Sequence, residues 1–290
     1  ERSMDQLIID LYDSFTHGLV RRRAFLDRLT EIAGSSAAAL ALLPLLQNDY
    51  ARAATVAPDD TRLAIDTASY DAGGAKVSGY LARLKAKGKR PAVIVIHENR
   101  GLNPHIQDIA RRLALDGFLA FAVDMLSPLG GTPADEDKAR DMIGTLNGDE
   151  TGRRIAAAVP FLEKHVESTG KVGAVGFCWG GGMVNRIAVL SPDLKAAVAY
   201  YGAQPPAAAV KSIRAPLLLH YAGLDQRINA GIPAYEAALK ADKKRFTIYI
   251  YPNVNHAFNN DTSNRYDKPA ADLAWSRTIA FFKENLGAPA

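Results

Sequence analysis

A short apolar run that ends in a glycine-framed cysteine constrains the fold of this chain more than any other stretch. Residues 172–177 read Val-Gly-Ala-Val-Gly-Phe and predict a buried strand, and the glycines after Cys178 predict a sharp turn into a helix. Gly176 and Gly180 flank the cysteine where the backbone has to fold back on itself. This turn delivers Cys178 to a helix N-terminus, where unpaired N–H groups favour a thiolate.

Two interpretations of Cys178 are open at this point. Free cysteine is among the most buried residue types, so a packing role is one interpretation. The glycine frame favours the other, a nucleophile held on a strained turn. The single cysteine cannot form an internal disulfide, and no group of Cys and His residues has the spacing of a zinc site. We therefore expect neither a metal nor a cofactor.

Strands and helices alternate along residues 58–290, which we take as one domain. Most of the predicted strands are continuous apolar runs, typical of a parallel sheet covered by helices on both faces. Two alternating runs around residues 71–74 predict an antiparallel hairpin at one edge. Ligands of such a sheet bind beyond the carboxyl ends of the strands. The predicted strands are 63–70, 77–84, 91–97, 119–124, 172–177, 196–201, 216–222 and 246–251, with helices at 106–116, 153–167 and 270–286 among them.

Composition and charge exclude several classes of protein. Hydrophobic residues make up 48% of the 290 residues and charged residues 23%, which excludes disorder over most of the chain. The net charge is only +4, and the basic runs at 21–23 and 85–90 lie on no nucleic-acid-binding motif. We therefore expect no nucleic-acid partner. The apolar stretch 33–46 is too short and too rich in small residues to predict a stable membrane span.

Residues 1–57 differ from the rest of the chain. Apolar residues recur at helical spacing from residue 7 to residue 15, and Arg22-Arg23 then precedes an alanine- and leucine-rich stretch and a small-x-small site at 51–53. This order resembles a twin-arginine export signal and predicts a periplasmic protein. The alternative is a helical extension that is retained in a cytoplasmic protein. A homodimer through these helices is compatible with either interpretation.

Two polar residues follow the cysteine at the ends of later strands. Asp225 comes after the apolar run 216–222, and His256 comes after the run 246–251. Taken singly, Asp225 is typical of a turn and His256 of a loop. Nucleophile, acid and base in that chain order are typical of the α/β-hydrolase fold. In such a triad His256 takes the proton from sulfur and returns it to the leaving group, while Asp225 holds the imidazole in one tautomer.

Over residues 60–287 the chain resembles the dienelactone hydrolase family. The resemblance is carried by the elbow 176–181, the stretch 95–103, Asp225 and the run 256–258. It implies an α/β-hydrolase fold and a triad of Cys178, His256 and Asp225. It also implies that Glu98 contacts the thiol in the resting enzyme and helps to form the thiolate, the alternative for Glu98 being a salt bridge at a strand end. The oxyanion hole would be the backbone N–H groups of Trp179 and Asn99.

The chain departs from the family pattern at the positions that bind the substrate carboxylate. The family holds a substrate carboxylate with two arginines, but the loop 124–131 contains none and the second position is Asn260. The charge-assisted contacts of these arginines are therefore missing, and Arg100 or Arg265 is a candidate to replace them. We therefore expect a less charged ester, lactone or thioester, bounded by Trp179, Tyr201 and Phe258.

The function predicted from the sequence is a cysteine-dependent hydrolase of small esters or lactones, acting through an acyl-enzyme on a small-molecule substrate. A binding or redox-sensing protein with a reactive thiol is one alternative, and a thioesterase or peptidase is another. The remaining histidines are predicted to be ordinary: His17, His105 and His165 as surface or packing residues, and His220 as a hydrogen-bonded core residue.

Overall fold

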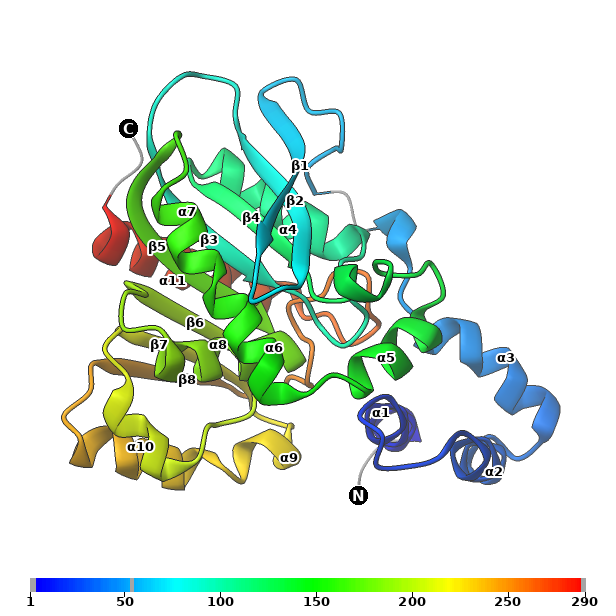
Figure 1. The fold of residues 1–290 in the computed structure, drawn as a ribbon. Coiled ribbons are helices and arrows are strands. Elements are labelled where there is room, and N and C mark those ends of the chain that lie inside the picture. Colours follow the sequence, from blue (N-terminus) through cyan, green and yellow to red (C-terminus); the bar gives the residue numbers. More distant parts are fainter. Residues whose placement is uncertain (1–3, 53–54, 288–290) are drawn as a thin grey trace.

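A single eight-stranded sheet runs through the chain in the order β1-β2-β4-β3-β5-β6-β7-β8 (Figure 1). The computed structural model describes residues 4–52 and 55–287. Strands β3 to β8 are parallel, and β1 and β2 form the antiparallel edge, with β2 pairing antiparallel to β4. The predicted mostly parallel sheet with an antiparallel hairpin is therefore confirmed. The strands are β1 Leu63–Asp71, β2 Lys76–Leu84, β3 Arg90–Ile96, β4 Leu119–Asp124, β5 Ser168–Phe177, β6 Ala196–Tyr200, β7 Leu217–Ala222 and β8 Phe246–Tyr251.

Helices cover both faces of the sheet because the central strands are buried on both sides. Strands β3, β4, β6 and β7 contain only buried residues, so each face needs its own apolar cover. One core cluster joins the sheet to α6 Gly148–Ala156, α7 Ala158–Glu163, α8 Trp179–Leu190 and α10 Ile232–Ala241. A second cluster joins the other face to α4 Pro104–Leu115 and α11 Lys268–Leu286.

The N-terminal helices form a third, separate core cluster. Helices α1 Met4–Thr16, α2 Arg22–Ala33 and α3 Ser36–Leu46 pack on one another around Phe15, Phe25 and Leu29. Figure 1 shows this group in blue beside the sheet, close to α5 Glu136–Gly144. Hydrogen bonds from Asn48 and Tyr50 to the Glu136 carboxylate connect the two groups of helices. The segment is thus joined to the sheet domain mainly through polar contacts at its edge.

No helix among the described residues is by itself long and apolar enough to cross a membrane. Helices α2 and α3 pass such a test only as a pair, and the chain bends by 111° between them.

One predicted helix is observed as two shorter helices with different bounds. The expected helix 153–167 is two helices, α6 and α7, and the last residues of that range precede β5, which begins at Ser168. Pro160 lies in the first turn of α7, where its missing N–H costs no hydrogen bond. The break therefore falls where a proline can begin a new helix.

Candidate active site

Cys178 lies on the turn between β5 and α8 in a backbone conformation that is rare for any residue with a side chain. Its φ is 56° and its ψ is −117°. The turn is held by hydrogen bonds from the Cys178 N–H to the Tyr200 carbonyl oxygen (3.0 Å) and from the Gly182 N–H to the Cys178 carbonyl oxygen (3.2 Å). The side chain is buried, with 7% of the residue exposed, and its sulfur borders a cavity.

The glycines of the elbow are required by close backbone contacts. A Cβ atom on Gly176 would lie 2.1 Å from the Gly180 carbonyl oxygen, and one on Gly180 would lie 2.2 Å from the Ile96 carbonyl oxygen. Both distances are far below any allowed contact, so a side chain at either position forces the backbone apart. This turn therefore requires glycine at both positions that flank the cysteine.

The structure brings His256 and Asp225 to the same end of the sheet as Cys178. His256 lies in the loop after β8, and its Nδ1 is 2.5 Å from Asp225 Oδ2. Asp225 follows β7, caps the short helix α9 Gln226–Asn229 and is 5% exposed. The buried His256 Nε2 has no hydrogen-bond partner among the described residues. A ring nitrogen of His256 and the Cys178 sulfur lie within 4.8 Å of each other.

Electrostatics at the site favour a thiolate beside an imidazolium. Burial raises the pKa of Cys178, but the nearby imidazoles of His256 and His17 outweigh it and lower this pKa to about 6. Burial lowers the pKa of His256, but Asp225, Cys178 and Asp13 raise it well above its usual value. The attraction between the sulfur and the His256 ring contributes to both shifts, and Asp225 is the larger influence on His256.

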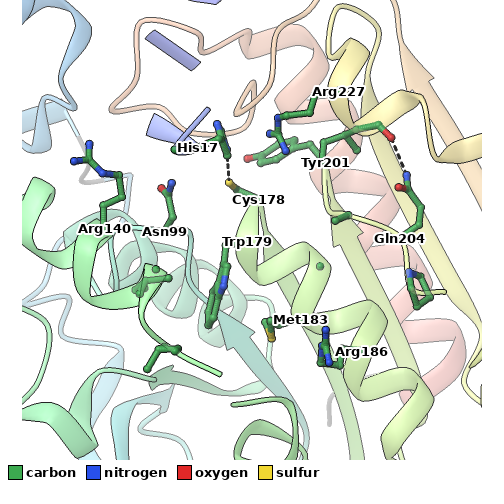
Figure 2. Close-up of a pocket in the computed structure, with 18 of the residues that line it drawn as sticks. His17, Asn99, Arg140, Cys178, Trp179, Met183, Arg186, Tyr201, Gln204 and Arg227 are labelled. Atoms are coloured by element: carbon green, nitrogen blue, oxygen red, sulfur yellow. Dashed lines mark hydrogen bonds between the residues drawn. The ribbon is translucent and has the colours of Figure 1, made fainter. Parts of the chain in front are cut away.

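A cavity of about 1000 Å³ opens above the cysteine (Figure 2). Its walls mix apolar side chains, such as Trp179 and Met183, with arginines from three helices. Arg140 and Arg186 form ion pairs with neighbouring aspartates, whereas the one ion pair of Arg227 within the described residues is with Asp13, at 4.0 Å. The space is large enough for a small-molecule substrate.

The residues expected to form an oxyanion hole both line this cavity. Trp179 is the first residue of α8, so its N–H has no carbonyl one turn earlier to bind. Its indole stacks on the His97 ring at 5.2 Å. Asn99 follows β3, and its side-chain Nδ2 donates to the Thr16 carbonyl oxygen at 2.8 Å.

Glu98 is buried beside the site and is bound by Asn260 rather than by an arginine. Asn260 Nδ2 donates to Glu98 Oε2 at 2.8 Å, and Glu98 Oε1 has no hydrogen-bond partner among the described residues. Neither the predicted contact with the thiol nor the alternative salt bridge is found for Glu98 in the described part of the chain. Asn260 itself is 1% exposed and faces the carboxylate, not the cavity.

Tyr201, Phe258 and Arg100 were also expected to contact the substrate, and of these Tyr201 lines the cavity. Tyr201 has a buried hydroxyl that lacks a described partner and a strained φ of 38°. Phe258 is a correction: it is fully buried behind Tyr201, with ring centroids 5.5 Å apart, because the loop turns its apolar side chain into the core. Arg100 is a second correction, since its guanidinium binds Tyr12 and the Glu136 carbonyl oxygen away from the cavity.

Sequence reasoning missed His17. This residue follows α1 directly, and its Nε2 lies 3.3 Å from the Cys178 sulfur. Figure 2 shows its ring above the sulfur in this view, with Trp179 below the sulfur. A lone histidine 161 positions from the cysteine carries no local signal for such a contact. His220 does match the expectation of a hydrogen-bonded core residue, with Thr278 and Tyr251 as its partners.

His17, Cys178 and His256 together form a group of the kind that can bind a metal ion. One ligand atom from each lies within 4.8 Å of the other two. The imidazole and thiolate donors are those that zinc prefers. The spacing of these residues along the chain gave no such indication, and the expected absence of a metal stays a prediction.

Comparison with known proteins places the chain in a family. Residues 77–286 match the model of the dienelactone hydrolase family. A protein of Saccharolobus solfataricus named "Putative carboxymethylenebutenolidase" is 32% identical over 252 residues, covering 74% of this chain and 96% of that protein. A protein of the same name from Escherichia coli K12 is 32% identical over 246 residues, covering 79% of this chain and 90% of that protein.

A solved structure agrees with the sequence comparison. A dienelactone hydrolase-like promiscuous phosphotriesterase from metagenomic libraries superimposes with a TM-score of 0.69 at 28% identity, covering 78% of this chain and all of that chain. The chain therefore belongs to the dienelactone hydrolase family of ester and lactone hydrolases, with the α/β-hydrolase fold.

Proposed function

We propose that this protein hydrolyses small carboxylic esters or lactones through a Cys178–His256–Asp225 triad and an acyl-enzyme intermediate. The observation that carries the proposal is the strained turn of Cys178, which presents a buried sulfur beside an imidazole paired with a carboxylate at 2.5 Å. That arrangement supplies a nucleophile, a base and a group that fixes the tautomer of the base.

The reaction follows from the protonation states of these groups. The Cys178 thiolate attacks the substrate carbonyl carbon, and the backbone N–H groups of Trp179 and Asn99 bind the oxyanion that forms. The His256 imidazolium gives its proton to the leaving alkoxide, which leaves a thioester on Cys178. His256 then removes a proton from water, the hydroxide attacks the thioester, and the acid departs as the thiolate returns.

Substrate charge is the second part of the proposal. Asn260 replaces the arginine of the family pattern and is bound to Glu98, and Arg265 is held by Asp13 at 2.7 Å. Neither residue offers a free cation to a substrate carboxylate. Of the arginines that line the cavity, Arg140 and Arg186 are paired with aspartates, whereas Arg227 lies 4.0 Å from Asp13. The proposed preference is for a neutral ester or lactone, and turnover of an anionic lactone tests whether Arg227 binds a substrate carboxylate.

The test is a comparison of Cys178→Ala and Cys178→Ser with the wild-type protein on a short aryl ester and on neutral and anionic lactones. We expect kcat/KM to fall at least a thousandfold in Cys178→Ala, because the covalent route is lost. In His256→Ala, mass spectrometry is expected to detect an acyl group on Cys178, since deacylation has lost its base.

Unchanged turnover in Cys178→Ala contradicts the proposal. Alkylation of Cys178 at neutral pH, with no hydrolysis of any ester or lactone, favours a binding or redox-sensing protein instead. A preference for thioesters or peptides in the same panel favours the thioesterase or peptidase alternative.

A further inference from the structure

We propose that His17, delivered by the N-terminal helix α1, is a further catalytic residue that hydrogen-bonds to the Cys178 sulfur and holds it as a thiolate. This inference rests on the proposed cysteine chemistry but adds a residue outside the triad, from a segment outside the matched family region 77–286. The contact that carries it is the 3.3 Å distance between His17 Nε2 and the Cys178 sulfur (Figure 2).

The neighbours of His17 fix the tautomer of its ring. Nδ1 lies 2.7 Å from the Asp13 carbonyl oxygen, which can only accept a hydrogen bond. Nδ1 therefore carries a hydrogen, and Nε2 faces the sulfur as an acceptor for the thiol proton. When that proton moves from sulfur to Nε2, the products are a thiolate and an imidazolium joined by one hydrogen bond, with no change in total charge.

His17 and His256 are arranged as two imidazoles around one sulfur. Their ring centroids are 4.8 Å apart and their planes are 86° apart. Each ring binds an oxygen through Nδ1, Asp13 for His17 and Asp225 for His256. In this proposal either ring can take the single proton released by the thiol, and either imidazolium stabilises the thiolate.

The position of His17 is set by the body of the enzyme as well as by its own helix. Asn99 Nδ2 binds the Thr16 carbonyl oxygen at 2.8 Å, which fixes the residue just before His17. The Asp13 carboxylate forms an ion pair with Arg265 Nη1 at 2.7 Å, on the same loop as His256. The end of α1 is thus attached to two loops that form the site. These contacts hold the His17 imidazole within hydrogen-bond distance of the Cys178 sulfur.

Several other charged and titratable groups surround the pair. Arg265, in the loop after β8, interacts electrostatically with the Cys178 sulfur. Tyr201, directly after β6, does the same. Burial raises the pKa of the Asp13 carboxyl, but the nearby His256, His17, Arg265 and Arg227 outweigh it and lower this pKa to about 2. Asp13 therefore stays ionised at neutral pH and favours the charged form of His256.

The experiment measures the alkylation rate of Cys178 by iodoacetamide against pH in the full-length wild type, His17→Ala and His17→Gln, together with kcat and KM for the aryl ester. We expect the midpoint of alkylation to rise by about one pH unit in His17→Ala, with a rate about fivefold lower at pH 6. We expect kcat to fall at least tenfold with a smaller change in KM. His17→Gln, which retains a donor for the thiolate, is expected to lie between the two.

Leu19→Ala is the matched control, because Leu19 is two positions away and 65% exposed. It is expected to keep the wild-type midpoint and kcat, and circular dichroism checks that every variant is folded. An unchanged midpoint in His17→Ala overturns the inference, and so does faster alkylation at an unchanged midpoint, which would mean that His17 only covers the sulfur. Because alkylation needs no substrate, this result is independent of whether Cys178→Ala abolishes hydrolysis.

Discussion

At the scale of single residues, Gly180 and Gly182 on the first turn of α8 experience opposite constraints. A Cβ on Gly180 would lie 2.2 Å from the Ile96 carbonyl oxygen, whereas one on Gly182 would have its nearest neighbour, the Ala203 amide nitrogen, at 3.5 Å. The first contact is forbidden and the second is ordinary. The surrounding backbone therefore excludes a side chain at Gly180 but leaves room for one at Gly182.

We predict that Gly180→Ala lowers the free energy of unfolding by about 3 kcal/mol or more, because backbone of β3 and α8 has to separate. Gly182→Ala is expected to leave it unchanged or raise it by up to about 1 kcal/mol, as alanine favours a helix. Urea unfolding followed by circular dichroism measures both. Equal effects of the two substitutions would show that the Gly180 contact is not the cause.

The same scale shows what the sequence could predict of the site. Cys178, Asp225 and His256 each follow a predicted strand, so their positions at one end of a parallel sheet follow from local pattern and topology. His17 has no such strand before it. Its position depends on the docking of a whole helix, which no spacing in the sequence encodes.

At the scale of elements, the N-terminal helices form a cluster with its own small core. Phe25 is 1% exposed and stacks on Phe15 with ring centroids 4.5 Å apart. Arg140 of α5 lies over Phe15 at 4.6 Å, and Arg22 forms an ion pair with Asp137. An export signal at Arg22-Arg23 stays a prediction. The contacts above are those that attach the N-terminal helices to α5.

We predict that Phe25→Ala loosens α1 and α2 without unfolding the sheet. The lost packing is worth about 3 kcal/mol, and the cluster shares few apolar contacts with the rest of the molecule. Amide hydrogen exchange is expected to become faster in α1 and to stay unchanged in β3 and β5. Leu40→Ala, at a position 61% exposed, is the control and is expected to leave both sets of amides unchanged. Equal acceleration throughout the sheet would mean that the helices and the sheet unfold together.

Two of the eight strands were predicted to the residue, and the others differ at one or both ends. The strands at 119–124 and 246–251 are observed with those bounds as β4 and β8. The helix predicted at 153–167 was wrong in its extent, because the amphipathic pattern continues across the junction of α6 and α7 and does not reveal the break. Hydrophobic periodicity identifies an apolar face but not a change in helix direction.

At the scale of the whole molecule, buried ion pairs join distant segments around the active site. Asp13 connects α1 to the loop after β8 through Arg265. Asp261, in the same loop, binds His105 Nδ1 at 3.0 Å and also contacts Arg112, so it connects that loop to α4. Two ion-pair groups thus attach the loop that carries His256 to the rest of the chain. One attaches it to α1 through Asp13 and the other to α4 through Asp261.

These aspartates determine how stability depends on pH in acid. Burial raises the pKa of Asp261, but His105 and Arg112 lower it to about 2, below the value near 4 expected in the unfolded chain. The unfolded chain therefore binds the proton first as the pH falls. The stabilisation from Asp261 is complete above about pH 4 and is lost between about pH 4 and pH 2. With allowance for solvent screening it amounts to about 1 kcal/mol.

We predict that Asp261→Asn is less stable than the wild type by about 1 kcal/mol at pH 7, and that this difference disappears as the pH approaches 2 because the wild-type carboxyl is then also uncharged. Urea unfolding at a series of pH values measures it. Arg112 retains Asp108 as a partner in the variant, so the fold is expected to survive the substitution. Asp59→Asn, at an exposed position, is the control and is expected to follow the wild type at every pH. A stability difference that stays constant down to pH 2 would show that Asp261 acts through packing and not through its charge.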